Sequence, residues 1–187
     1  NLSITSGAAS LLAAIENKYR GSRTLRMKRF FLLFCVLLLS LFTLELWRPV
    51  QHFVIVPWTQ ILAQLSGLIA HFFDADVVSQ GKLLLDRNTG SGVSIEAGCN
   101  GIEACLILIA AMLAYPSHWR QKLAGILIGI IAVQAVNVVR IVSLFYLAAW
   151  NAEIFRFAHL YLWQALIMID VLIVWLLWIR HLSRYSE

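Results

Sequence analysis

The chain has 187 residues, of which 60% are hydrophobic and 13% are charged, and its formal net charge at pH 7 is +5. A soluble domain carries about 25% charged and about 45–50% apolar residues, so this composition excludes an ordinary water-soluble domain and favours a membrane protein. The basic residues gather at the ends of apolar segments, which is the pattern of membrane topology and argues against a nucleic-acid partner.

The N-terminal segment differs from the rest of the chain. Met27, followed by Lys28, Arg29 and an apolar run, resembles a bacterial start. We therefore interpret residues 1–26 as a cytoplasmic extension or a non-native segment, and residues 27–187 as a single integral-membrane domain. Because no small-x-small cleavage site follows the first apolar run, we expect that run to be an uncleaved anchor.

Four apolar segments have about the length of a membrane helix, and a fifth segment, 53–73, is interrupted by Pro57 and several polar residues. Basic clusters at the N-terminus, in the loop 116–122 and at the C-terminus should all face the cytoplasm. If 53–73 crossed the membrane, the loop would fall on the other side. The sequence thus predicts an all-α polytopic membrane protein with both termini cytoplasmic, in which 53–73 is an amphipathic interfacial or re-entrant helix at the outer face. The predicted spans are about 30–47, 101–115, 123–144 and 160–179.

A polar stretch precedes the second predicted span. Lys82–Asp86 and Val93–Glu96 flank the turn-rich sequence RNTGSG, which predicts a small β-hairpin. Two roles remain open for this hairpin. It either covers the helices as a lid or captures an extended peptide along an open strand edge.

Cys99 lies in the sequence EAGCNGIEA, at the predicted mouth of the second span. A helix N-terminus lowers the pKa of a thiol, and the free N–H groups of a first turn can hold a developing oxyanion. Asn100 and Gly101 are supporting candidates, since Gly101 allows close approach of a backbone or substrate. Glu103 opposes thiolate formation, so a nearby cation is required.

Arg140 and His159 provide a cation and an acid/base group at the same predicted membrane depth as the cysteine. An arginine inside an apolar helix is costly, and it should therefore face the bundle and have a partner. Asn137, one turn before Arg140, is expected to orient the guanidinium. His159 begins the fourth predicted span and is a candidate general acid/base.

The other cysteines, Cys35 and Cys105, lie inside apolar runs and are assigned no role. The cysteines and histidines show no metal-ligand spacing. We therefore predict no metal and no cofactor.

Together these segments resemble the exosortase/archaeosortase family of membrane proteins. EAGCNGIEA is similar to the family's Cys-x-Gly segment, NVVRIVSLF to its Asn-x-x-Arg segment, and AHLYLW to its following histidine segment. The resemblance covers about residues 28–180 and is strongest to the exosortase H subgroup. It implies that Cys99 is the nucleophile, Arg140 the stabiliser of the oxyanion or thiolate, and His159 the proton donor and acceptor.

The resemblance also implies a function, a substrate class and a location. The enzyme would cleave C-terminal sorting signals, made of a motif, a membrane helix and a basic cluster, through a cysteine thioester. The motif would be of PEP-CTERM type, or of Ile-Pro-Thr-Leu-x-x-Trp type for the H subgroup. The location would be the bacterial inner membrane, with the active site facing the periplasm and with water or an amine as acceptor.

Three other functions remain open. A non-catalytic scaffold or biogenesis subunit of an export or exopolysaccharide system would not need the Cys99 thiol. A channel lined by Arg140 and Asp170 would need a continuous polar stripe. A lipid acyltransferase would use the same cysteine with another donor.

Overall fold

The structure, a computed structural model, describes the backbone of residues 2–184 and the side chains from Thr24 onward. The described part is mostly helical, with one small antiparallel sheet that comes between residues 71 and 102 in the chain. The helices are α1 (Leu2–Glu45), α2 (Arg48–Val50), the π-helical turn η1 (Gln51–Ile55), α3 (Val56–His71), α4 (Ile102–Ala114), α5 (Trp119–Trp150), α6 (Ala152–Phe157), the π-helical turn η2 (Ala158–Leu162) and α7 (Trp163–Arg184).

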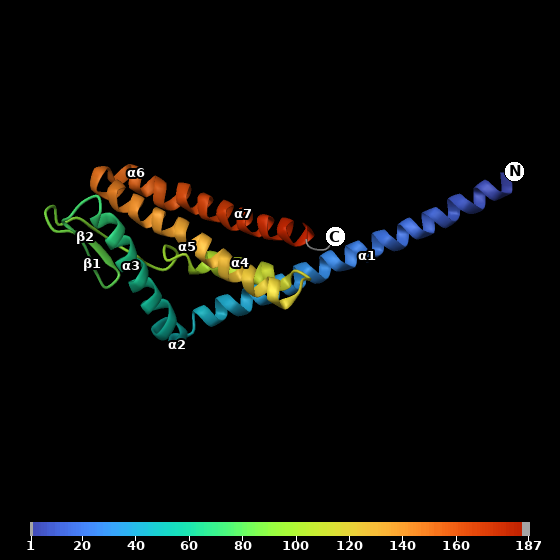
Figure 1. Ribbon diagram of the computed structural model, residues 1–187, viewed down its shortest axis with the longest axis horizontal. Helices are drawn as coiled ribbons and strands as arrows, with labels where there is room; N and C mark the ends of the chain where they lie inside the picture. Colours follow the sequence, from blue (N-terminus) through green and yellow to red (C-terminus); the bar gives the residue numbers. More distant parts are fainter. Residues whose placement is uncertain (1, 185–187) are drawn as a thin grey trace.

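Four helices, α1, α4, α5 and α7, form an elongated bundle (Figure 1). The chain reverses direction between α4 and α5 and again between α5 and α7, and the first half of α1 extends beyond the bundle. The start of α5 and the end of α7 lie at the same end as the part of α1 that holds Phe30, whose ring packs on Trp175 of α7. The three basic clusters are therefore gathered at one end of the bundle, as the charge pattern predicted.

The prediction of an all-α polytopic membrane protein is confirmed, and four helices among the described residues are long and apolar enough to cross a membrane. Three of the four correspond to predicted spans, and the fourth does not. Residues 48–71 meet the criteria of length and composition, whereas α4, expected as a full span, has only 13 residues. α4 is short because Pro116 disfavours helical geometry at Tyr115, which is extended with ψ 134°.

The segment 48–71 packs on only part of the bundle. Leu62, Ala63 and Ala70 belong to the same buried cluster as Ile141 and Phe145, which lie in the half of α5 that follows Asn137. Its other face carries a row of exposed apolar side chains. This packing is compatible with the interfacial or re-entrant placement predicted for 53–73, although length and composition alone would also allow a crossing.

The predicted hairpin exists and gains a third strand. Strand β2 (Leu83–Asp86) pairs antiparallel with β3 (Gly92–Ser94), in the register Leu84↔Val93. The additional strand β1 (Val77–Gln80) pairs with the other edge of β2 and packs on α3. Because a two-stranded hairpin is marginal in water, this third strand and the contact with α3 explain why the sheet is stable next to the bundle.

Two buried clusters hold the molecule together. One joins α4, α5 and α7 around Leu108, Met112 and Val133, all fully buried. The other joins α3, the sheet and the later half of α5 around Leu84 and Ile95. Cys99 packs against the second cluster, so the end of the bundle under the sheet is where the candidate site forms.

Candidate active site

The structure brings the three predicted chemical groups together. The Sγ atom of Cys99 lies 3.6 Å from Nδ1 and 3.9 Å from Nε2 of His159. It also accepts a hydrogen bond from Nη2 of Arg140 at 3.5 Å. The three residues come from the loop after β3, from α5 and from η2. The guanidinium and the imidazole thus both lie within reach of the thiol, at one end of the bundle.

A tight turn after β3 presents the cysteine. The N–H of Cys99 donates to the carbonyl of Glu96 at 3.0 Å, and Gly98 has a φ of +83°, which favours glycine. The N–H of Gly98 donates to Oε1 of Glu103 at 2.6 Å. Glu103 therefore fixes the turn that carries Cys99, in addition to placing a negative charge near the thiol.

The expected role of the α4 N-terminus is wrong in one respect. The helix begins at Ile102, three residues after Cys99, and the first N–H group of the helix donates to Oδ1 of Asn100 at 3.1 Å. The sulfur of Cys99 instead has the side chains of Arg140 and His159 as its hydrogen-bond partners. Stabilisation of the sulfur in this state thus comes from side chains and not from the first turn of α4.

A buried polar network lies directly behind Cys99. Asn100 is 1% exposed; its Nδ2 donates to Oγ1 of Thr59 and its carbonyl accepts from Nε2 of Gln134, at 3.4 and 3.3 Å. Gly101 has a φ of +70°, and a Cβ there would lie 3.0 Å from the amides of Asn137 and Gln134. Asn100 and Gly101 therefore have structural reasons for their identity, since they lock the turn to α3 and α5.

Arg140 is 3% exposed and reaches Cys99 without the help predicted from Asn137. The amide of Asn137 donates to Oε1 of Gln134 at 3.4 Å, because its side chain points toward Gly101. Among the described residues, Nε of Arg140 has no hydrogen-bond partner. The guanidinium thus keeps a buried donor free beside the sulfur.

His159 is positioned by an irregular segment between α6 and α7. The π-helical turn η2 carries it, and such turns often occur at functional sites. The ring of Phe155, one turn earlier, stacks on the imidazole with a centroid distance of 5.6 Å and an interplanar angle of 3°. Asn151 caps α6, its Oδ1 accepting from the N–H groups of Glu153 and Ile154 at 2.8 and 3.2 Å.

The pKa of the Cys99 thiol is raised above its ordinary value. Burial is the largest cause, because it disfavours the thiolate. The positive charge and hydrogen bond of Arg140 act in the opposite direction, while Glu103 and Glu96 raise the pKa further. In this state the cysteine is therefore held mainly as the neutral thiol.

A cavity of about 310 Å³ opens onto these groups. One wall consists of the consecutive residues 92–97, and the other contains Arg140, Leu144 and Ala148 of α5. Phe155 and His159 close it on the side of α6. The cavity is large enough for a short peptide segment and is bordered by all three chemical groups.

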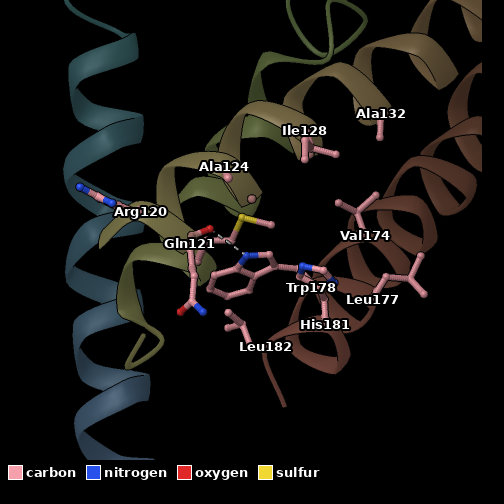
Figure 2. A pocket seen from close by; sticks show the side chains of 13 residues that line it. Arg120, Gln121, Ala124, Ile128, Ala132, Val174, Leu177, Trp178, His181 and Leu182 are labelled. Atoms are coloured by element: carbon pink, nitrogen blue, oxygen red, sulfur yellow. Dashed lines mark hydrogen bonds between the residues drawn. The ribbon is translucent and has the colours of Figure 1, made fainter. Parts of the chain in front are cut away.

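A second hollow lies at the opposite end of the bundle and has a different character. Figure 2 shows it between α5 and α7, where Ile128, Val174 and Leu177 give it an apolar lining. Trp178 Nε1 donates to the carbonyl of Gln121 at 3.1 Å. The groove contains neither Cys99 nor Arg140, so we do not assign the chemistry to it.

Several residues of the site were not identified from the sequence. Gln134, Thr59 and Phe155 contact the site only through the fold, and no pattern along the chain marks them. Glu103 was noticed for its charge, but its contact with Gly98 was not expected. The described residues contain no cluster of three or more His, Cys, Asp or Glu side chains with the geometry to hold a metal ion.

A comparison with known proteins identifies the family. The model of the transmembrane exosortase family, EpsH type, matches residues 4–177, nearly the whole chain. No curated protein and no solved structure matched the chain. The chain belongs to the transmembrane exosortase family, whose general function is membrane protein sorting by transpeptidation.

Proposed function

We propose that this transmembrane exosortase is a membrane-embedded cysteine peptidase or transpeptidase that removes C-terminal sorting signals from exported proteins. The observation that carries the proposal is the convergence of Arg140 and His159 on the sulfur of Cys99, at 3.5 and 3.6 Å. A nucleophile with a base and a cation each within reach of it is an arrangement suited to covalent catalysis.

Cys99 is the nucleophile in the proposed reaction. His159 accepts the thiol proton, and the thiolate attacks the carbonyl carbon of the scissile peptide bond. The tetrahedral intermediate collapses as the C–N bond breaks, and His159 returns the proton to the leaving amine. The amino-terminal product remains attached to Cys99 as a thioester, which an amine or water then attacks, so that the C–S bond breaks and the thiolate is released.

Arg140 stabilises negative charge in each of these steps. Its Nη2 already contacts the sulfur, and its buried Nε, which has no partner among the described residues, is a further donor available to an oxyanion. Such preorganised donors are worth more in a low-dielectric site than in water. The guanidinium is thus proposed to have the stabilising role that the family resemblance implied for Arg140.

We place the site at the periplasmic face of the bacterial inner membrane. Arg140 lies eighteen positions after Lys122 on α5, which corresponds to a rise of about 27 Å. The hydrocarbon core is about 30 Å thick. If the basic end of the bundle, including Lys122, faces the cytoplasm, Arg140 lies close to the opposite boundary.

The substrates we propose are proteins with a C-terminal signal of the PEP-CTERM kind, possessing either that motif or the Ile-Pro-Thr-Leu-x-x-Trp motif. Their signal helix would lie in the bilayer beside α4, α5 and α7. The residues before that helix would then emerge at the depth of Cys99. The acceptor is an amine or water.

Co-expression with a candidate substrate tests the proposal. We expect Cys99→Ala, Arg140→Ala and His159→Ala each to abolish processing, seen as loss of the shorter product on immunoblots. Cys35→Ala is the matched control, because Cys35 is exposed on α1, away from the site. Processing by the Cys99→Ala chain at the wild-type level would reject the enzymatic function and favour a scaffold.

A further inference from the structure

Strand β3 forms the wall of the cavity that faces Arg140, and it is an edge strand. The strand order is β1–β2–β3, so β2 covers one edge of β3 and no other described strand covers the second. An uncovered edge presents unpaired N–H and C=O groups that can pair with another chain. The main-chain N–H and C=O groups of β3 therefore divide into those that pair with β2 and those that face the second edge.

The register decides which groups are free. The N–H of Asp86 donates to the carbonyl of Ser91, and the N–H of Ile95 donates to the carbonyl of Lys82, both at 2.9 Å. In an antiparallel ladder the bonded residues alternate, so Ser91, Val93 and Ile95 point their main-chain groups at β2. Gly92 and Ser94 consequently direct theirs to the uncovered edge.

That edge borders the cavity. The strand residues 92–94 and the following residues 95–97 all line it. Because successive side chains of a strand point to opposite faces, adjacent lining residues within β3 indicate that the main chain of the strand contributes to the wall. Val93 packs on the core cluster beside Leu84 and Ile95, so this face of the sheet is covered by the protein core. A bound chain would therefore contact β3 along its edge.

We propose that the substrate binds as an added strand along β3, with its main chain paired to Gly92 and Ser94. This inference rests on the proposed function and specifies how the same site holds its substrate. The occupant is an extended polypeptide, because only a polypeptide main chain offers alternating donors and acceptors at the two-residue repeat of this edge. The turn from Glu96 to Cys99 follows β3 after one residue. A substrate strand paired with β3 would therefore extend toward the sulfur of Cys99 and bring its own carbonyl groups close to it.

The arrangement also explains how one site accepts many proteins. Main-chain pairing binds any extended sequence, and selectivity is left to alternate side chains of the substrate. Gly92 is a residue of β3 that packs tightly on β2. A Cβ at Gly92 would lie 2.5 Å from Leu85 Cδ2 and 2.8 Å from the carbonyl oxygen of Leu84, so a side chain there would disturb the strand.

Ser94 provides a test on this chain. Ser94→Pro removes the outward N–H and costs the sheet little, because proline is tolerated on edge strands. Ser94→Ala removes the hydroxyl, which donates to Glu96, but keeps the N–H. In co-expression with a substrate that the wild type processes, we expect the proline variant to process about five- to tenfold more slowly than the alanine variant, the effect of one lost main-chain hydrogen bond.

A second arm uses the substrate. Proline and alanine are placed in turn at each of the residues preceding the cleavage site that the wild type defines. Strand pairing predicts that the excess loss caused by proline appears at every second residue, since only alternate N–H groups face β3. An excess loss without this alternation would overturn the inference.

Two further measurements separate the possible failures. Alkylation of Cys99, read by mass spectrometry, reports whether the Ser94→Pro chain keeps its site, and we expect it to match Ser94→Ala. The Cys99→Ala chain is assayed in parallel. If it is inactive while the two Ser94 variants process equally, strand pairing is rejected and the proposed function stands; if it still processes, the proposed function itself fails.

Discussion

At the scale of single residues, the thiol of Cys99 lies between a cation and two carboxylates. Arg140 lowers its pKa, while burial, Glu103 and Glu96 raise it, and the sum is a pKa above the ordinary value. The thiolate is thus scarce at neutral pH. In the proposed reaction His159 takes the thiol proton as the substrate binds, and a resting thiol of this kind is protected from adventitious alkylation or oxidation.

This balance predicts opposite effects of two substitutions on the reactivity of Cys99. Arg140→Gln removes a positive charge, so the pKa of Cys99 should rise and alkylation at a fixed neutral pH should slow. Glu96→Gln removes a negative charge, so the pKa should fall and alkylation should quicken. The rate of Cys99 alkylation against pH, followed by mass spectrometry, checks both, and shifts of the two midpoints in the same direction would contradict the account.

The sequence identified some residues of the site and missed others for a physical reason. Cys99, Arg140 and His159 each stand out because reactive or charged groups are rare in an apolar chain. Gln134 and Thr59 do not stand out, since their role depends on contacts with Asn100 across three segments. The pairing of Asn137 with Arg140, inferred from helical spacing, failed because Gly101 lets the Asn137 side chain turn toward the loop.

At the scale of elements, helix α6 is a short connection that positions His159. Asn151 ends α5 in an extended conformation and caps α6 with two hydrogen bonds. Phe155 lies in α6, and its ring covers the imidazole of His159. The placement of His159 thus depends on a helix of only six residues, in which the N-cap is an important source of stability.

We therefore expect Asn151→Ala to destabilise α6 by about 1 kcal/mol and to reduce substrate processing, although Asn151 lies outside the reacting groups. Asn151→Asp should restore processing, because aspartate is an equally good N-cap. Processing and thermal unfolding in detergent provide the two measurements. An aspartate variant as impaired as the alanine variant would show that the cap is not the reason.

The elements were only partly predictable from the sequence. Hydropathy located the apolar helices and turn residues located the hairpin, because both signals are local. The strand β1 was missed, since Val77–Gln80 is short and is defined by its pairing with β2 and its contact with α3. α4 was overestimated as a full span, because its apolar residues are set by burial among α1, α5 and α7 as well as by lipid.

At the scale of the whole molecule, the basic clusters lie at one end of the bundle and the candidate site lies at the other. The start of α5, the end of α7 and the basic region of α1 lie at one end, and the sheet covers the other (Figure 1). Charge counting along the sequence predicted this separation, because the positive-inside rule acts on the ends of spans. A substrate with a basic cluster after its membrane helix would be oriented in the same way.

The topology predicts which cysteines an impermeant thiol reagent reaches in intact cells. Cys99 should be labelled from outside once the outer membrane is permeabilised, whereas a cysteine introduced by His118→Cys, in the loop between α4 and α5, should be labelled only after the inner membrane is opened. His118 is exposed, so the control site is accessible in its own compartment. Labelling of Cys99 only from the cytoplasmic side would reverse the orientation.

The central claim is that Cys99 forms a thioester with the amino-terminal product, and hydroxylamine tests it most directly. Hydroxylamine cleaves thioesters, so membranes that contain the wild-type chain and a substrate should release a product whose new C-terminus is a hydroxamate, identified by mass spectrometry. The Cys99→Ala chain should release none. A product that carries only a free carboxylate in the presence of hydroxylamine, formed equally by the Cys99→Ala chain, would contradict the account.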